Sequence, residues 1–289
     1  MTRAERGTIF LEKARVISQL AYDAEQFVLR LAAPKCAARA EPGTFVHLTC
    51  DAAIPMRRPL SIMRANAAAG WIELLYKVVG AGLHALAARK TGDELSLLGP
   101  IGRPFAVQAE RPRVVLLGGG VGIPPMVFLA ERLATQGGWK PLVLMGSEVP
   151  FPFRTRPSAI IVPGIPAGCI ACLPLLEEWG VPCRLASCAD FPGCFPGFVT
   201  ELAAAWLESL TQAELAQVEI FACGPTAMLA ASTQLARRYH LPCQVSLEEF
   251  MACAVGGCAG CTVLVRTGAG AAMKRVCVDG PVFDAYTVF

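Results

Sequence analysis

Three cysteines near the end of the chain have a spacing that suits a metal centre. Cys253, Cys258 and Cys261 form the pattern C-x4-C-x2-C, and Cys277 follows after a strand-like run. Soft thiolates at the C-x4-C-x2-C spacing are the plant-type signature of a 2Fe–2S cluster. The sequence therefore predicts that these four cysteines hold a 2Fe–2S cluster.

The residues between the cysteines support this chemistry. A loop around a cluster needs unusual backbone angles and amide N–H groups turned toward the sulfides, and Gly256, Gly257 and Gly260 permit both. The alternative is a structural zinc site in a non-enzymatic binding protein. Zinc sites favour a C-x2-C pair on each side, whereas only one such pair occurs here and Cys277 stands alone.

The chain has 13 cysteines, and a second group of them lies between residues 169 and 194. The C-x2-C pair of this group flanks an apolar dipeptide close to Pro174, and Cys183 opens an apolar strand. We interpret the group as core packing rather than as a second metal site. Its members are Cys169, Cys172, Cys183, Cys188 and Cys194.

The first residues of the chain mix charged with apolar side chains and lack the continuous apolar run of a signal peptide. We therefore predict a cytoplasmic protein without disulfides. The uncharged stretch 157–176 is long enough to span a membrane, but its four prolines would break a spanning helix. We predict buried strand and loop there, and no membrane span.

The composition indicates a globular protein of two or three domains. Of the 289 residues, 54% are hydrophobic and 17% are charged, which argues against disorder. The formal net charge of +3 lacks the strongly basic character of a nucleic-acid-binding protein, so we expect no nucleic acid as a partner.

Three segments differ in their pattern. Residues 1–108 read as short strands separated by Gly, Pro and Asp, which predicts an antiparallel β-barrel with one short helix within residues 82–93. Residues 109–245 alternate strands with helices, which predicts a doubly wound parallel sheet, with one strand at residues 159–164. Residues 246–289 are short and cysteine-rich and lack a core of their own. The fold class predicted is thus multidomain, β followed by α/β, with a small C-terminal 2Fe–2S domain.

Two glycine-bearing turns follow strands of the second segment. In "GGGVGIPP" (118–125), glycines allow the backbone to approach a pyrophosphate at a helix N-terminus, and Pro124 and Pro125 suit the first helical turn. In "FACGPTAM" (221–228), Cys223 ends a strand at the edge where open sheets bind ligands. Alternatively, either turn only connects a strand to a helix. Cys223 would then be a buried residue at the end of its strand.

The stretch "RRPLSI" (57–62) lies on a barrel strand beside the predicted dinucleotide-binding segment. Arg58 is suited to pair with a pyrophosphate, and Ser61 is placed to reach a flavin ring. The three histidines, His47, His84 and His240, are not part of any recognisable catalytic arrangement, and we predict no catalytic acid or base.

Taken together, "RRPLS", "YKVVGAG", "GGGVGIPP", "FACGPTAM" and the terminal cysteines resemble the electron-transfer subunits of NAD-dependent dihydroorotate dehydrogenases, a branch of the ferredoxin reductase superfamily. The resemblance covers nearly the whole chain. It implies an FAD-binding barrel (1–108), an NAD-binding domain (109–245) and a 2Fe–2S domain (246–289), with FAD, NAD(H) and the cluster as cofactors.

The resemblance also implies site residues. The flavin contacts would be Arg58, Pro59, Leu60, Ser61, Leu75, Tyr76, Lys77, Gly82 and Leu83. The nicotinamide-side loops would be Gly118, Gly119, Gly120, Gly122, Cys223, Gly224 and Pro225, and the cluster ligands Cys253, Cys258, Cys261 and Cys277. Leu83 departs from the family, which has a threonine there. Arg154 and Arg156 stand in a proline-rich loop and would suit a 2′-phosphate, so the preference for NAD over NADP is modest.

The function implied is electron transfer between NAD and a partner flavoenzyme. That partner would be an FMN-containing catalytic subunit that oxidises dihydroorotate in pyrimidine biosynthesis, in a heterotetramer with two subunits of each kind. The alternative is a reductase subunit of another redox complex, of the hydrogenase, sulfite reductase or ferredoxin–NAD(P) reductase type.

Overall fold

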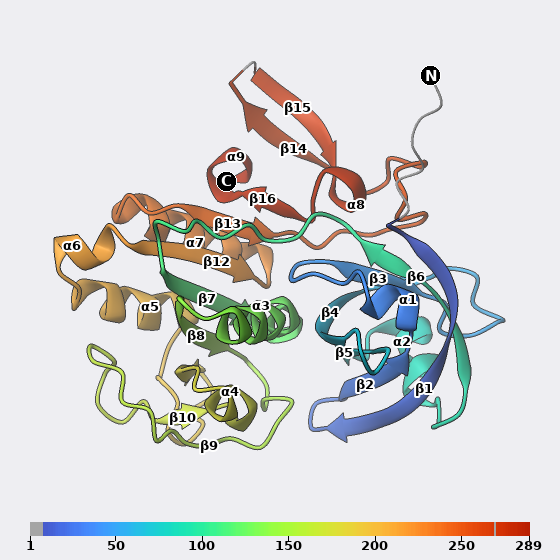
Figure 1. Ribbon diagram of the computed structural model, residues 1–289, viewed down its shortest axis with the longest axis horizontal. Coiled ribbons are helices and arrows are strands. Elements are labelled where there is room, and N and C mark those ends of the chain that lie inside the picture. Colours follow the sequence, from blue (N-terminus) through green and yellow to red (C-terminus); the bar gives the residue numbers. More distant parts are fainter. Residues whose placement is uncertain (1–7, 269) are drawn as a thin grey trace.

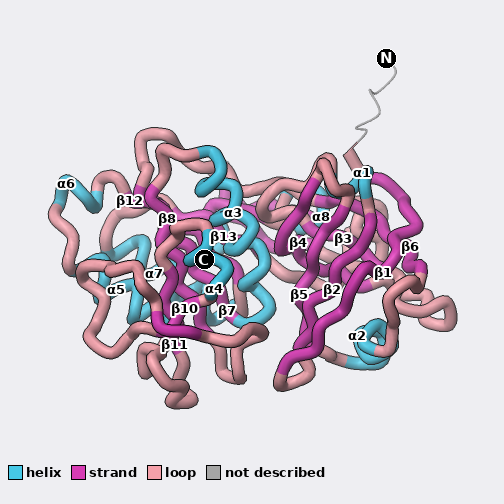
Figure 2. The backbone as a smooth tube through the Cα atoms, turned by 60° about the horizontal axis from the view of Figure 1, so that its bottom comes forward, coloured by secondary structure: helices cyan, strands magenta, loops and turns pink. Residues whose placement is uncertain are grey.

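A closed barrel and an open sheet lie side by side in the protein (Figure 1). The structure is a computed structural model, and it describes residues 8–268 and 270–289. A view turned by 60° shows the same separation, with the barrel strands on one side and the helix-covered sheet on the other (Figure 2). Within the described residues, no helix is both long and apolar enough to cross a membrane.

The barrel contains six antiparallel strands in the order β1-β2-β5-β4-β3-β6, as the sequence predicts. In β1, buried residues such as Ala14 and Val16 alternate with exposed ones, because one face of the strand lines the barrel core. The strands are β1 (Phe10–Tyr22), β2 (Gln26–Ala32), β3 (Phe45–Leu48), β4 (Arg58–Asn66), β5 (Trp71–Lys77) and β6 (Glu94–Ile101).

The barrel segment carries two short helices rather than the single one predicted. The predicted helix is α2 (Gly80–Ala87). The other is α1 (Pro34–Ala37), one turn whose Cys36 N–H donates to the carboxylate of Glu12 at 2.7 Å. A turn this short has no apolar period, so the sequence gives it no signal.

The open sheet has six strands in the order β11-β8-β7-β12-β13-β16. The first five are parallel, and β16 adds an antiparallel edge next to β13. The strands are β7 (Arg113–Gly119), β8 (Lys140–Gly146), β11 (Cys183–Ala186), β12 (Val218–Cys223), β13 (Cys243–Ser246) and β16 (Val282–Asp284).

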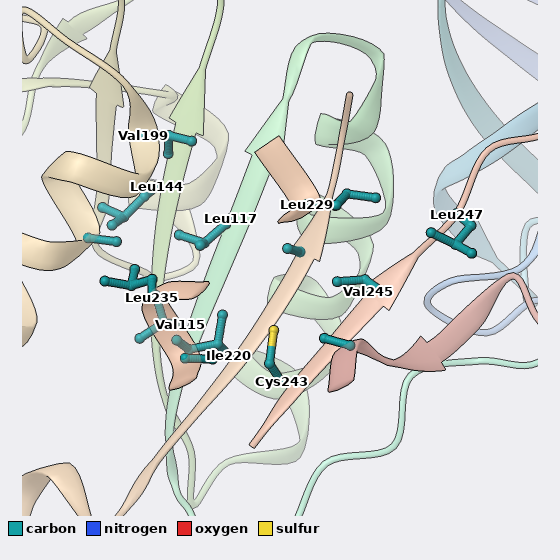
Figure 3. Close-up of a cluster of buried hydrophobic side chains, with 14 of the residues drawn as sticks. Val115, Leu117, Leu144, Val199, Ile220, Leu229, Leu235, Cys243, Val245 and Leu247 are labelled. Atoms are coloured by element: carbon teal, nitrogen blue, oxygen red, sulfur yellow. The ribbon is translucent and has the colours of Figure 1, made fainter. Parts of the chain in front are cut away.

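Helices cover both faces of this sheet, so its strands are buried on both sides. In β7, Val115 and Leu117 pack on the α5 and α7 face (Figure 3), whereas Val114 and Leu116 pack on the α3 face. The helices are η1 (Gly120–Gly122), α3 (Ile123–Gln136), α4 (Pro174–Glu178), α5 (Val199–Glu208), α6 (Gln212–Leu215) and α7 (Thr226–Arg238).

The strand predicted at residues 159–164 is wrong. The chain makes turns there, and Ile161 is 89% exposed. The carboxylate of Glu177 accepts the N–H groups of Ala159 and Ile160 that a strand would give to a neighbour. The only pairing in the described part of this region is between β9 (Arg156–Pro157) and β10 (Ala171–Cys172).

The C-terminal segment makes a hairpin and then returns to the sheet. Strands β14 (Thr262–Thr267) and β15 (Gly270–Arg275) pair only with each other, and α8 (Val276–Asp279) follows. The chain then adds β16 to the open sheet and ends in α9 (Ala285–Val288). Part of the segment therefore packs in the hydrophobic core of the open sheet instead of forming a core of its own.

Barrel and sheet are joined by a half-buried ionic contact. Arg64 of β4 donates to both carboxylate oxygens of Glu131 in α3, with Nη2–Oε1 at 2.6 Å. The same guanidinium lies over the rings of Trp71 and Trp179. These contacts fix the angle between the two parts.

Candidate cofactor sites

A cleft of about 1010 Å³ opens between the barrel and the C-terminal segment. Its barrel wall comes from β4, β5 and α2, and its other wall is the continuous run 246–252. The structure brings eight of the nine residues predicted to contact flavin to this cleft. They are Arg58, Pro59, Leu60, Ser61, Leu75, Tyr76, Lys77 and Leu83.

Gly82 is the ninth, and it lies against Arg58. A Cβ on Gly82 would stand 2.8 Å from Arg58 Nε. Arg58 Nη1 donates to the carbonyls of Met56 at 2.8 Å and Arg57 at 3.2 Å, and no carboxylate pairs with Arg58 in the described residues. A guanidinium that no carboxylate of the described residues neutralises stands beside the first turn of α2, where it combines a cation with unpaired backbone N–H groups. This end of the cleft therefore fits a diphosphate such as that of FAD.

The neighbouring Arg57 has a different role. It donates to the carbonyls of Ser96 at 2.8 Å and His47 at 3.1 Å, and to the Ser96 hydroxyl at 2.8 Å. Burial lowers the pKa of Arg57. Arg57 thus ties β3, β4 and β6 together, while Arg58 stays available to a ligand.

One residue that supports the walls of the cleft has no sequence signal. Gln19 of β1 donates Nε2 to the carbonyls of Leu86, Ala87 and Arg89 at 3.0–3.2 Å, so it closes the C-terminus of α2. Its Oε1 accepts from the hydroxyl of Tyr76 at 3.0 Å. Gln19 therefore links α2 to β5, the two elements that carry most of the predicted flavin contacts.

The two glycine turns meet each other. Residues Cys223 and Gly118 are register partners at the ends of β12 and β7. A Cβ on Gly122 would stand 2.3 Å from the Cys223 carbonyl oxygen, and one on Gly119 would stand 2.5 Å from the sulfur of Met228. Only glycine fits at position 122, because the atoms it meets belong to the backbone, whereas the Met228 side chain near Gly119 can move. By contrast, Gly120 has a φ of +53° and open space around it, so it is free to face a ligand.

None of the seven predicted nicotinamide-side residues lines the flavin cleft. From the first turn, Val121 lines the cleft. Gly224 and Pro225 instead line a neighbouring pocket of about 300 Å³. This pocket shares the wall residues Leu247, Glu248 and Glu249 with the cleft. Burial raises the pKa of the Cys223 thiol, so this residue is a neutral, packed side chain at the strand end.

The four terminal cysteines lie as two pairs. The Sγ atoms of Cys261 and Cys277 are 3.4 Å apart, and the Cys258 N–H donates to Cys253 Sγ at 3.4 Å. Among the described residues, no three acidic, histidine or cysteine side chains converge on one point as a single metal ion requires. A 2Fe–2S cluster instead takes two thiolates at each of two irons, so paired donors fit it better than zinc.

The backbone around these cysteines stabilises the thiolate form of a cysteine. Burial acts to raise the pKa of Cys253, but the N–H groups of Val255, Cys258 and Gly257 outweigh it and lower the pKa to about 6. Ala254 and Gly256 take positive φ values of 57° and 84°, which turn successive amides inward. The guanidinium of Arg275 holds the loop by donating to the Gly256 carbonyl at 2.9 Å.

The second cysteine group lies mainly in the core. Cys169, Cys172 and Cys183 are buried among the apolar side chains on the two faces of the sheet. Burial raises the pKa of Cys183 to about 12, so it stays a neutral thiol. Cys194 is half-buried beside them, and Cys188 is exposed. The positions of Cys169, Cys172, Cys183 and Cys194 agree with packing, whereas the prediction of core packing is wrong for the exposed Cys188.

Comparison with known proteins gives consistent results. Residues 248–289 match the family described as the iron–sulfur cluster binding domain of dihydroorotate dehydrogenase B. The chain is 32% identical over 247 residues to the electron transfer subunit of dihydroorotate dehydrogenase B (NAD(+)) from Shouchella clausii, covering 84% of each chain. It is also 32% identical to that subunit from Geobacillus thermodenitrificans, covering 95% of this chain and 96% of the other.

Solved structures agree with this relationship. An NADH-dependent reduced ferredoxin–NADP oxidoreductase structure superposes with a TM-score of 0.76 at 26% identity, covering 96% of this chain and 90% of that chain. Phthalate dioxygenase reductase, at 14% identity and a TM-score of 0.57 over 92% of this chain and 76% of that chain, shares the fold. The chain therefore belongs to the family of electron transfer subunits of NAD-dependent dihydroorotate dehydrogenase B.

Proposed function

We propose that this chain carries electrons between NAD and a catalytic subunit that oxidises dihydroorotate. The main support for the proposal is the continuous segment 246–261, which contributes to both sites. Residues 246–252 form one wall of the flavin cleft, and the first predicted cluster ligand, Cys253, is the next residue. The flavin site and the cysteine site are thus built on one continuous stretch of backbone.

The protein residues supply binding and position rather than acid–base chemistry. Bound FAD exchanges a hydride with nicotinamide and single electrons with an iron–sulfur cluster. Arg58 and the first turn of α2 would hold the FAD diphosphate, and Ser61 would face the ring. The strand residues 75–77 line the same cleft. The residues at the ends of β7 and β12 would receive nicotinamide.

The proposed sites define proposed domains. The barrel (1–108) would hold FAD, the α/β unit (109–245) would hold the nucleotide, and residues 246–289 would hold the cluster on Cys253, Cys258, Cys261 and Cys277. Arg156 is partly engaged with Glu177 at 3.9 Å, which leaves it less available to a 2′-phosphate and favours NAD(H).

The proposed partner is an FMN-containing catalytic subunit in the cytoplasm. The relatives are named as electron transfer subunits of a dehydrogenase, which implies a second, catalytic chain. We propose two copies of each subunit in the complex. A second candidate is a ferredoxin–NAD(P) reductase type of complex, which the 26% identical solved structure favours.

Anaerobic co-purification of this chain with the dihydroorotate-oxidising subunit tests the function. We expect FAD, FMN, iron and acid-labile sulfide in the complex, and loss of FAD absorbance on adding dihydroorotate only when both subunits are present. Recovery with another redox enzyme, with no effect of dihydroorotate, would support the second candidate. Zinc without iron or sulfide would reject electron transfer altogether.

A further inference from the structure

A buried histidine lies between the barrel and the segment that leads to the cysteine site. Val46 and Leu48 of β3 belong to the barrel core. Because side chains alternate along a strand, Phe45 and His47 face outward. The chain between β13 and β14 passes over this side of the barrel (Figure 1), and Phe45 shares an apolar cluster with Met251. Under this cover, His47 is 0% exposed.

Neither nitrogen of the His47 ring is satisfied. Nδ1 and Nε2 both lack a hydrogen-bond partner among the residues that the structure describes. The backbone carbonyls of Met251 and Arg57 lie beside the ring and act to raise its pKa, but neither completes a hydrogen bond. Buried polar groups are nearly always paired, so two unpaired nitrogens at this depth require an explanation.

The two carbonyls distinguish the protonation states of the ring. Carbonyl oxygens only accept, and a neutral imidazole has a single N–H to donate. The imidazolium has two N–H groups, one for the carbonyl of Met251 in the C-terminal segment and one for that of Arg57 before β4. Protonated His47 would therefore tie the segment to the barrel, whereas neutral His47 can hold only one of the two.

The surroundings of His47 oppose the protonated form. Burial lowers the pKa of His47 most, and the guanidinium groups of Arg57 and Arg58 lower it further. On β6, the residues opposite this part of β3 are Leu97 and Leu98, which carry no charge. The ring is therefore neutral at pH 7 in this state.

The covering segment does not offset these cations. Its ionisable residues are Glu248, Glu249 and Cys253. Both glutamates line the cleft, and burial raises the pKa of Glu248. Cys253 is a proposed cluster ligand. The side chains that act most on the pKa of His47 remain Arg57 and Arg58.

A diphosphate at Arg58 changes this balance. The FAD diphosphate is proposed to lie at Arg58 and the first turn of α2, where its negative charge offsets a guanidinium that disfavours a proton on His47. FAD binding should therefore favour the imidazolium. The coupling is reciprocal, so protonated His47 strengthens FAD binding by the same factor.

We propose that His47 is a positioning residue, which takes up a proton from water when FAD binds and then donates to the carbonyls of Met251 and Arg57. This rests on the proposed function, because it needs FAD at Arg58. Met251 lines the flavin cleft, and Cys253 is two residues further on. Filling the flavin site would thus fix the backbone that presents the first cysteine.

The test is calorimetric titration of FAD into full-length protein that keeps its iron but has been stripped of FAD, in buffers of different ionisation enthalpy. Wild type is expected to take up part of a proton on binding, because the pKa of His47 rises from a value below the ordinary one of about 6.5. The dissociation constant should rise as pH rises from the free-state to the bound-state pKa, by at most about tenfold per pH unit.

Three variants assign the proton and the positioning role. His47→Gln keeps an amide that can donate to a carbonyl but cannot titrate, so it should bind FAD without proton uptake. His84→Gln, exposed on α2, is the matched control and should keep the uptake. His47→Leu removes both functions. FAD should slow hydrogen exchange of residues 246–253 in wild type and His47→Gln, but not in His47→Leu.

Iron content is matched between samples, because the pKa of Cys253 also lies near neutrality, at about 6. Uptake that persists in His47→Gln, or that disappears in His84→Gln, would overturn the assignment to His47. FAD binding by wild type without proton uptake would overturn the inference and leave the proposed function intact. If wild type does not bind FAD, both fall. Equal protection of residues 246–253 in folded His47→Leu would overturn the positioning role, and if that variant does not fold, His47→Gln still decides the proton.

Discussion

The guanidinium of Arg58 lies directly against the backbone of Gly82. The two residues come from β4 and α2, and a Cβ at position 82 would stand 2.8–2.9 Å from three guanidinium atoms. This approach sets the cation beside the free N–H groups at the start of α2. Gly82 therefore makes room for the guanidinium in its present position, and its backbone angle is ordinary.

The first prediction is that Gly82→Ala weakens FAD binding without unfolding the protein. The new methyl group displaces the flexible end of Arg58, and the loss of one charge-assisted contact to phosphate costs about 1.5–3 kcal/mol. The dissociation constant for FAD should rise roughly tenfold to a hundredfold, measured by flavin fluorescence titration of apoprotein. The control is His84→Ala, an exposed change on the same helix.

Arg58→Ala should reproduce this loss, because it removes the same cation. If Gly82→Ala and Arg58→Ala both keep the wild-type affinity for FAD, the diphosphate does not lie at this end of the cleft.

The sequence predicted residues that line one cleft, because these residues are close together along the chain. Arg58 to Ser61 and Leu75 to Lys77 are consecutive runs on neighbouring strands, so a short motif is enough to mark them. The same motif did not distinguish the structural Arg57 from the available Arg58. That distinction depends on Ser96, which only folding brings to Arg57.

Gln19 shows why other residues could not be predicted. Its partners are backbone carbonyls 67–70 residues away, and any residue type can supply a carbonyl. No local pattern reports such a contact. The turns at 159–164 have a similar origin, because a distant carboxylate, that of Glu177, accepts the N–H groups of this apolar stretch.

The second prediction concerns Gln19→Glu. A carboxylate keeps the acceptor for Tyr76 but cannot donate to the three carbonyls at the end of α2. We expect α2 to loosen, the protein to lose about 2 kcal/mol of stability, and FAD affinity to fall. The measurements are thermal unfolding of the apoprotein and FAD titration.

Tyr76→Phe separates the two halves of this contact. It leaves the three carbonyl bonds in place and removes only the hydroxyl, so it should affect FAD affinity less than Gln19→Glu. Leu20→Ala, the exposed neighbour, is the control. An unchanged FAD affinity in Gln19→Glu would show that α2 does not depend on Gln19.

The third prediction is that Gly122→Ala impairs nicotinamide use while FAD stays bound. A Cβ there would meet the backbone carbonyl of Cys223 at 2.3 Å, and backbone cannot move aside as a side chain can. The two turns must separate, which displaces the ends of β7 and β12. We expect a higher KM for NADH in dye reduction, with FAD content near wild type.

Reduction of the flavin by dithionite should be unaffected in this variant, which serves as its internal control. Wild-type KM in Gly122→Ala, in protein shown to be folded, would mean that the contact between the turns does not shape the nicotinamide site.

The paired arrangement of the cysteines was only partly visible in the sequence. Spacing predicted the four donors, but it did not predict that Cys261 and Cys277 are buried while Cys258 is exposed. Nor does the spacing show that β16 joins the open sheet, because a three-residue strand carries no period. That strand changes what the loss of a cysteine should do.

The last prediction is that Cys277→Ser removes the cluster but not the flavin chemistry. A serine oxygen is a harder ligand than thiolate and a poor substitute at iron. The loop and hairpin should loosen, but β16 still pairs with β13, and the Leu247 N–H still donates to the Pro281 carbonyl at 2.9 Å. Hydrogen exchange should therefore rise in residues 253–275 more than in 282–289.

The predicted FAD contacts come from β4, β5 and α2 and the predicted nicotinamide residues from the ends of β7 and β12, so the Cys277→Ser variant should keep NADH-dependent reduction of small dyes and lose transfer to or from the catalytic subunit. Both turnovers are measured on one preparation with its iron content, and Cys188→Ser, an exposed cysteine outside the site, is the matched control. Iron loss must accompany the loss of coupled turnover. If coupled turnover persists in protein without iron, electrons reach the partner directly from the flavin, and the terminal cysteines serve only to hold the segment together.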